Sequence, residues 1–182
     1  MPDLLQILTI GHSVHPLDEF ISLLKLHGVQ LLADIRSFPG SRHVPQFNAE
    51  ALAASLQAEN IAYKLVKNLG GRRKAHVDSI NTGWHHPAFR GFADYMQTAD
   101  FARGLIELLE MASQQRTCIM CAEAMPWRCH RSLVADALLI KDVQVWHIFP
   151  DGSLHPHRLT PFAQVRNGIL IYPSPDNLPL AP

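Results

Sequence analysis

The chain has few cysteines, no excess of either charge and no long apolar run, and each absence excludes a class of protein. Three cysteines in 182 residues are too few for the disulfide framework of a secreted domain. The 16 basic and 16 acidic residues balance, so no global field attracts nucleic acid or membranes. No apolar run approaches the roughly 20 residues that cross a bilayer. We therefore expect a cytoplasmic protein with no membrane partner.

The overall composition is ordinary for one globular domain. The apolar fraction is 47% and the charged fraction 18%. The first 13 residues have no basic region and no cleavage site, so we expect no secretory signal. We predict a single α/β domain over residues 1–165 and a proline-rich C-terminal tail over residues 166–182.

Apolar runs of strand length alternate with helical patterns along the chain. Strands are predicted at residues 4–10, 29–35, 61–66, 116–120 and 143–148, with a further possible strand at 169–172. Helices are predicted after Pro16, over 49–59, from Asp100 as a cap, and over 132–141. This alternation is typical of βαβ units. The fold class is therefore a three-layer α/β domain, with a mostly parallel sheet of about five strands and helices on both faces.

Polar residues follow the ends of the predicted strands. They are His12, Asp34, Arg36, Gly70, Gly71, Arg72, Arg73, Cys121, Glu123 and His147. Ligands of open α/β sheets bind at the carboxyl ends of the strands. The sequence therefore predicts one pocket at that edge.

The segment CIMCAEAMPWRCHRS, residues 118–132, carries the densest chemistry. An apolar strand leads to Cys121, a loop follows, and Cys129-His130-Arg131 leads into a helix. Helix N-termini attract anions, and Arg128 and Arg131 add bidentate donors. We predict a phosphate or carboxylate ligand.

A thiolate nucleophile is the first chemistry that this segment fits. A cysteine near a helix N-terminus and arginines is activated, with His12 or Glu123 as the acid or base. The six residues between Cys121 and Arg128 are one more than cysteine-dependent phosphatases use, and their glycine-rich cradle is missing. A direct equivalence with those enzymes is therefore not indicated.

Metal binding and simple packing are the competing interpretations. Cys121, Cys129, His130 and His147 are four possible zinc ligands, although the spacing of the cysteines is not that of a zinc knuckle. A third possibility is an anion or nucleotide pocket in which the cysteines only pack. Cys118, inside a strand, is expected in the core. Whether Cys121 and Cys129 approach closely enough for a disulfide stays open.

Residues 72–90 form a basic and aromatic excursion between two predicted elements. Such a stretch would also suit a non-catalytic nucleic-acid-binding protein, with Trp84 stacking on bases. The neutral net charge counts against this alternative.

Several of these segments together resemble one protein family. They are Thr9–Ser13, Asp34–Arg36, Leu69–Gly71, Phe89–Met96, Met120–Glu123, Cys129–Arg131, His147–Ile148, Asp151–Gly152 and His155–His157. Their order and spacing are similar to those of the family known as domain of unknown function 488. The resemblance implies an α/β domain and places His12, Asp34, Arg36, Cys121, Glu123, Cys129, His130 and Arg131 in family motifs. It implies no reaction.

We therefore predict a protein that binds or acts on a phosphate-bearing ligand, such as a nucleotide or a nucleic-acid end. Cys121 is the candidate nucleophile, with His12 or Glu123 as its acid or base. The candidate ligand-binding residues are Asp34, Arg36, Gly70, Gly71, Arg128, His130 and Arg131. The sequence leaves the cofactor unknown, and a metal-dependent hydrolase or structural zinc protein remains an alternative.

Overall fold

A six-stranded sheet forms the centre of the computed structural model, which describes residues 4–174 and 176. The strand order is β3-β2-β4-β1-β5-β6. The first five strands in this order are parallel, and β6 runs antiparallel to β5. Their bounds are β1 Gln6–Gly11, β2 Leu31–Asp34, β3 Ala62–Leu65, β4 Thr117–Cys121, β5 Gln144–Ile148 and β6 Leu154–Pro156. The predicted α/β class with a mostly parallel sheet is confirmed, and β6 is a strand that the sequence analysis missed.

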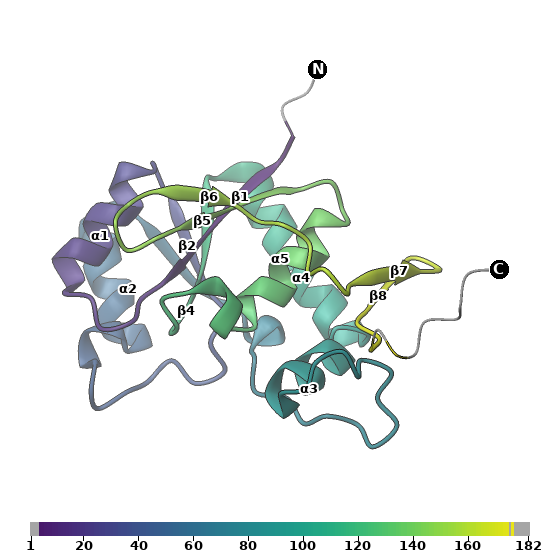
Figure 1. Cartoon of the computed structure of the whole chain (residues 1–182). Helices are drawn as coiled ribbons and strands as arrows, with labels where there is room; N and C mark the ends of the chain where they lie inside the picture. The colour runs from purple at the N-terminus through teal and green to yellow at the C-terminus, as the bar shows by residue number, and fades with distance from the viewer. Residues whose placement is uncertain (1–3, 175, 177–182) are drawn as a thin grey trace.

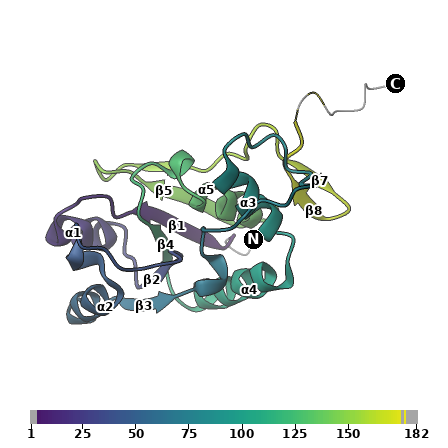
Figure 2. The same ribbon diagram turned by 90° about the horizontal axis from the view of Figure 1, so that it is seen from below.

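Helices cover both faces of this sheet (Figure 1). They are α1 Leu17–Leu26, α2 Ala49–Ala58, α3 Pro87–Tyr95, α4 Ala99–Gln114 and α5 Arg131–Leu139. Figure 2 shows α1 and α2 on one side of the strands, with α4 and α5 on the other. Within residues 4–174, no helix is both long and apolar enough to cross a membrane.

The central strand β4 shows how one sequence serves two cores. Cys118 and Met120 pack with the residues of α1 and α2, whereas Ile119 and Cys121 pack with those of α4 and α5. Successive side chains of a strand point to opposite faces, so a continuous apolar run is what a sheet buried on both sides requires. Cys118 is a core residue, as expected.

Residues at the helix ends explain where α1 stops and where α4 starts, and the predicted N-cap of α4 is corrected. Gly28 follows α1 with φ +65°, a left-handed conformation that favours glycine. The N-cap of α4 is Thr98, whose Oγ1 accepts a hydrogen bond from the Phe101 amide at 3.3 Å. The prediction that Asp100 caps this helix is wrong. Asp100 instead lies in the first turn, where its carboxylate is favourable to the helix dipole.

The excursion between β3 and α3 is held by a buried carboxylate. Asp94 accepts hydrogen bonds from the His76 amide, the Ser79 hydroxyl and the Asn81 side-chain amide, at 2.9, 2.6 and 2.8 Å. Trp84 stacks on Phe89 with ring centroids 4.9 Å apart. These contacts order the segment against the body of the protein.

The chain packs against the domain as far as Ser174, whose amide donates to Thr82 Oγ1 at 3.2 Å. A two-stranded hairpin, β7 Gln164–Arg166 and β8 Ile169–Ile171, precedes it, and β8 matches the possible strand predicted at 169–172. Tyr172 is buried, and its hydroxyl donates to the Asp136 carboxylate at 2.9 Å. The predicted domain boundary at residue 165 falls inside this hairpin. Residues 175 and 177–182 of the predicted tail lie outside the described residues.

The chain leaves two adjacent strands in opposite directions. After β2 it continues to α2 on one face, and after β4 it continues to α5 on the other. Adjacent strands whose connections diverge open a crevice at their carboxyl ends, which is where ligands of such sheets bind.

Candidate functional site

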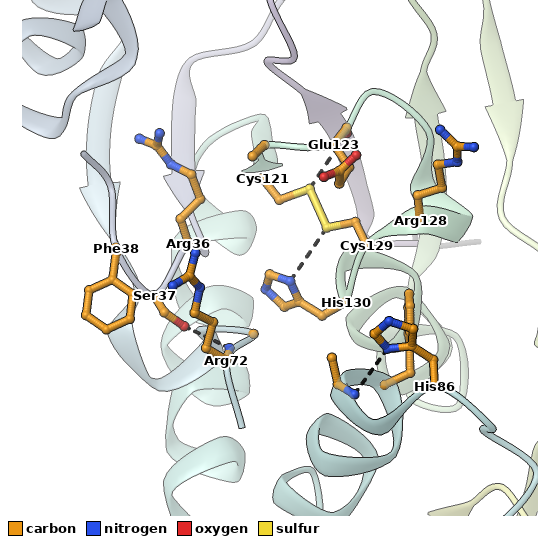
Figure 3. A pocket seen from close by; sticks show the side chains of 14 residues that line it. Arg36, Ser37, Phe38, Arg72, His86, Cys121, Glu123, Arg128, Cys129 and His130 are labelled. Atoms are coloured by element: carbon orange, nitrogen blue, oxygen red, sulfur yellow. Dashed lines mark hydrogen bonds between the residues drawn. A yellow bond between two sulfur atoms is a disulfide. The ribbon is translucent and has the colours of Figure 1, made fainter. Parts of the chain in front are cut away.

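A cavity of about 380 Å³ lies in this crevice (Figure 3). Its walls come from the loops after β2, β3 and β4 and from the start of α3. Among its lining residues are three arginines, Arg36, Arg72 and Arg128, and one carboxylate, Glu123. The balance of charge on the walls therefore favours an anion.

Two of these arginines are available to a ligand. Arg72 and Arg128 are exposed, and no hydrogen bond or ion pair within residues 4–174 engages either guanidinium. Arg72 lies over the ring of Phe38, 5.3 Å from its centroid. Figure 3 shows Arg72 and Phe38 on one side of the cavity and Arg128 on the other. An anion between them would have a guanidinium on each side.

Arg36, by contrast, is committed to the protein. Its Nη2 donates to Asp34 Oδ2 at 2.6 Å and to the Phe47 carbonyl at 2.7 Å. The Tyr63 hydroxyl donates to the same carboxylate oxygen at 2.6 Å, and burial is the main cause that raises the pKa of Tyr63. Asp34 has no exposed surface, so it acts on the cavity only by holding Arg36.

His12 completes this network beside the cavity. Its Nδ1 donates to the Ser13 carbonyl at 2.8 Å, which leaves Nε2 to accept from Arg36 Nη1 at 3.2 Å. Burial lowers the pKa of His12 to about 4, so the ring is neutral at pH 7. The ring stacks on Phe47 with centroids 4.4 Å apart. Neither His12 nor Asp34 is among the residues that line the cavity.

Arg131 is the most unusual group near the cavity because it is a completely buried cation. Its Nη1 donates to Cys121 Sγ at 3.2 Å and to the Glu123 carbonyl at 3.1 Å, and its Nη2 donates to the Ala124 carbonyl at 2.9 Å. No carboxylate within the described residues forms an ion pair with it.

Arg131 nevertheless stays charged. Burial lowers the pKa of Arg131 to about 10, which is still above neutral pH. A buried charge is unfavourable unless a counter-charge lies near. The one contacting atom that can acquire a full negative charge is the sulfur of Cys121.

Cys121 and Cys129 are joined as a disulfide, with their Cα atoms 7.3 Å apart. The sequence had left this pairing open. The Arg131 amide, at the start of α5, donates to Cys129 Sγ at 3.4 Å. Cys118 is the free cysteine, and burial raises its pKa. Of the three cysteines, Cys121 and Cys129 line the cavity and Cys118 does not.

His130 presents a free ring nitrogen to Cys129. Its Nε2 donates to the Ile35 carbonyl at 2.9 Å, so Nδ1 is the unprotonated nitrogen of the neutral ring. This Nδ1 lies 3.6 Å from Cys129 Sγ. Burial lowers the pKa of His130 to about 4, which keeps the ring neutral at pH 7.

Glycines let these groups approach closely. A Cβ on Gly71 would lie 2.3 Å from His130 Nδ1, and one on Gly70 would lie 2.8 Å from Ser37 Oγ. A Cβ on Gly11, the last residue of β1, would lie 1.7 Å from the Glu123 carbonyl oxygen. The sequence analysis missed Gly11, because nothing local to it shows that the loop after β4 folds over it.

The structure brings most predicted site residues together but places His147 elsewhere. His147 Nδ1 and Thr9 Oγ1 are 2.7 Å apart, and His147 Nε2 is 2.9 Å from His157 Nδ1. It lines a second cavity, beside β5 and β6. Of the four predicted zinc ligands, Cys121, Cys129 and His130 lie together and His147 lies apart, and no group of three or more side chains that could hold a metal ion is found within residues 4–174.

The segments that form the cavity fall within a match to a known protein family. The family model described as "Domain of unknown function DUF488" matches residues 16–138. The chain belongs to the DUF488 family. The match contains the Asp34–Arg36 segment and the whole loop from Cys121 to Arg131, while His12 and His147 lie outside it.

Beyond this family, no curated protein and no solved structure matches the chain significantly. The description of DUF488 names no activity.

Proposed function

We propose that this DUF488 protein binds a phosphate-bearing anion in the cavity between β2 and β4, and that reduced Cys121 is the nucleophile that acts on it. One observation carries the proposal. The buried guanidinium of Arg131 has no carboxylate partner within the described residues and donates to Cys121 Sγ at 3.2 Å. A cation in that position stabilises a thiolate, the reactive form of cysteine.

The anion would be held by groups that line the cavity on opposite sides. Arg72 and Arg128 supply guanidinium donors, which match phosphate oxygens geometrically. Arg36 contributes positive charge from its wall, although Asp34 offsets part of it. In this arrangement His12, Asp34 and Gly70 support the walls, while Gly71 and His130 line the cavity itself.

The nucleophile forms when the disulfide is reduced. A dithiol reductant transfers two electrons to the Cys121–Cys129 bond and leaves two thiols, of which Cys121 gives up its proton beside Arg131. Glu123 lines the same cavity and is the acid or base that the proposal assigns. The ring nitrogens of His12 are engaged by Ser13 and Arg36, so His12 serves as a support for Arg36.

The test is ligand protection of Cys121 in a Cys129→Ser variant, which removes the disulfide. We expect inorganic phosphate or a phosphate monoester to slow alkylation of Cys121 by iodoacetamide and to raise the melting temperature. Arg72→Ala and Arg128→Ala should weaken both effects. Arg166→Ala, an exposed arginine on β7, is the matched control.

Two results would contradict the proposal. One is alkylation of Cys121 at the rate of an ordinary thiol, unaffected by phosphate, in folded protein. The other is protection that is the same in the Arg72, Arg128 and Arg166 variants, since that protection would not come from this cavity.

A further inference from the structure

Two aromatic side chains are left in solvent, Phe38 on the wall of the cavity and Trp127 next in sequence to its lining residue Arg128. Phe38 is 68% exposed and Trp127 is 61% exposed. Within residues 4–174, every other strongly exposed large hydrophobic side chain is aliphatic. Aromatic side chains bury large areas when they contact a partner, so the exposure of Phe38 and Trp127 indicates a ligand-binding surface.

Each exposed ring accompanies an available arginine. Phe38 lies under the Arg72 guanidinium, and Trp127 directly precedes Arg128 in the 3-10 helix η3, Pro126–Arg128. Phe38 comes from the loop after β2, Arg72 from the loop after β3, and Trp127 with Arg128 from the loop after β4. Figure 3 shows Phe38 and Arg72 on one side of the cavity and Arg128 on the other. Cation and aromatic surface therefore alternate across the site.

Trp127 itself lines the second cavity, of about 420 Å³. Phe149 and Phe162 are among its other walls, and Trp127 packs edge-on to Phe149 with centroids 6.1 Å apart. The walls of the second cavity are mainly apolar, although Arg158 and three histidines also line it, whereas three arginines line the first. An elongated ligand that reached from the first cavity to the second would contact the arginines of the first and the aromatic rings of the second.

The two cavities are lined by neighbouring residues of the same segments. Helix η3 contributes Arg128 to the first and Trp127 to the second. The stacked pair of Trp84 and Phe89 does the same, with Phe89 on the first cavity and Trp84 on the second. Trp84 is half-buried against Phe89 and Phe162. It therefore forms part of the wall of the second cavity and is not the exposed ring for base stacking that the sequence suggested.

We propose that the ligand is a single-stranded nucleic acid, with one phosphate in the cavity between β2 and β4 and neighbouring bases stacked on Phe38 and Trp127. The place of the phosphate rests on the proposed function. Alternating guanidinium and aromatic groups suit a strand in which phosphates and unpaired bases alternate. In a duplex the base faces are already stacked on each other, so they are not available to these rings.

The neutral net charge is compatible with such a site because few phosphates would be contacted. With one phosphate held between two free arginines, the logarithm of the affinity should fall against the logarithm of salt with a slope of about −0.7. Most of the affinity would then come from stacking.

The experiment measures binding of a fluorescent, 5′-phosphorylated oligothymidylate of about ten nucleotides, within the usual site size of single-strand binders. Comparison probes are an abasic strand of the same length, a duplex, inorganic phosphate and a phosphoserine peptide. The variants are Phe38→Ala and Trp127→Ala. Ile106→Ala, an exposed aliphatic residue on α4, is the control.

We expect each aromatic variant to weaken binding of the oligothymidylate about tenfold or more, since stacking contributes strongly for each base. Binding of the abasic strand and protection of Cys121 by phosphate should be retained. Equal binding of the oligothymidylate and the abasic strand, or of the single strand and the duplex, would overturn this inference. If phosphate still protects Cys121 in that case, the proposed function stands. Tighter binding of the phosphopeptide would overturn the inference as well. Loss of phosphate protection would instead contradict the proposed function itself.

Discussion

Arg131 Nη1 lies 3.2 Å from Cys121 Sγ, at a position where Arg131 has no exposed surface. The first residue of α5 thus reaches back to the last residue of β4. Carbonyl oxygens of Glu123 and Ala124 occupy other donors of the guanidinium, but they carry no net charge. A thiolate at Cys121 would neutralise the buried cation, so the stability of the cation and the reactivity of the sulfur are linked.

Replacing Arg131 should therefore make Cys121 less reactive. We expect Arg131→Met, in the Cys129→Ser background, to slow alkylation of Cys121 by iodoacetamide at pH 7 by about tenfold, because the thiolate loses its counter-charge. Arg131→Lys, which keeps the charge, should lose less. Circular dichroism checks that each variant is folded, and an unchanged rate in folded Arg131→Met would contradict the pairing.

The sulfur pairing makes its own prediction for the wild-type protein. After treatment with glutathione disulfide and denaturation, we expect one free thiol per chain, that of Cys118. After treatment with dithiothreitol we expect all three. The two thiols lost on oxidation appear as two molecules of reduced glutathione, so the electrons balance. Peptide mapping should find Cys121 linked to Cys129, and three thiols under both conditions would contradict this.

The parts of the fold that the sequence predicts are those governed by local hydrophobicity. Apolar runs marked β1, β2 and β4 most clearly, because strands buried on both faces need side chains that suit either core. The edge strand β3, which is half-exposed, is marked by the buried residues Ile61 and Val66 that flank it. The edge strand β6, Leu154–Pro156, lacked this signal. The strand is short, its side chains are half-exposed or exposed, and two of its residues are histidine and proline. Its partner β5 defines it as a strand.

The site could be predicted as a region but not as a set of contacts. Gly11 pairs with Cys121 at the end of the sheet, whereas His147 pairs with Thr9, two residues below that end. This register, which depends on pairing between distant segments, is why His147 does not reach the cavity. The burial of Arg131 depends in the same way on Gly11, where no Cβ blocks the loop.

Three buried histidines should make the protein sensitive to acid. Burial lowers the pKa of His12 and of His130 to about 4, and that of His147 to about 3. The unfolded chain takes up these protons near pH 6.5, but the native protein cannot. Stability is therefore fully present above about pH 6.5 and falls as the pH drops toward 4, by up to about 1.4 kcal/mol per pH unit for each histidine.

Urea unfolding between pH 7 and pH 4.5 measures this slope. His147→Gln should lower stability at pH 7, because the hydrogen bonds to Thr9 and His157 are weakened, but it should also flatten the slope by about one proton. His43→Gln, at an exposed position, should leave the slope unchanged. A slope that is the same in both variants would mean that His147 is not the neutral, buried group described above.

The close approach of Gly71 to His130 gives a steric prediction with a matched control. A Cβ on Gly71 would lie 2.3 Å from His130 Nδ1, and the ring cannot easily move because its Nε2 is bonded to the Ile35 carbonyl. We expect Gly71→Ala to lower the free energy of unfolding by about 1–3 kcal/mol, as overpacking does. It should also weaken phosphate protection of Cys121, because Arg72 is the next residue.

Gly40→Ala separates this contact from the general effect of adding a methyl group. Neither Gly40 nor Gly71 has a positive φ, so alanine fits the backbone at both positions. Nothing lies within 4 Å of a Cβ at Gly40, and we expect a change of no more than about 0.5 kcal/mol there. Equal stability of the two variants would show that the His130 ring moves to make room for the new methyl group. Equal phosphate protection would show that the anion binds without His130 in its present position.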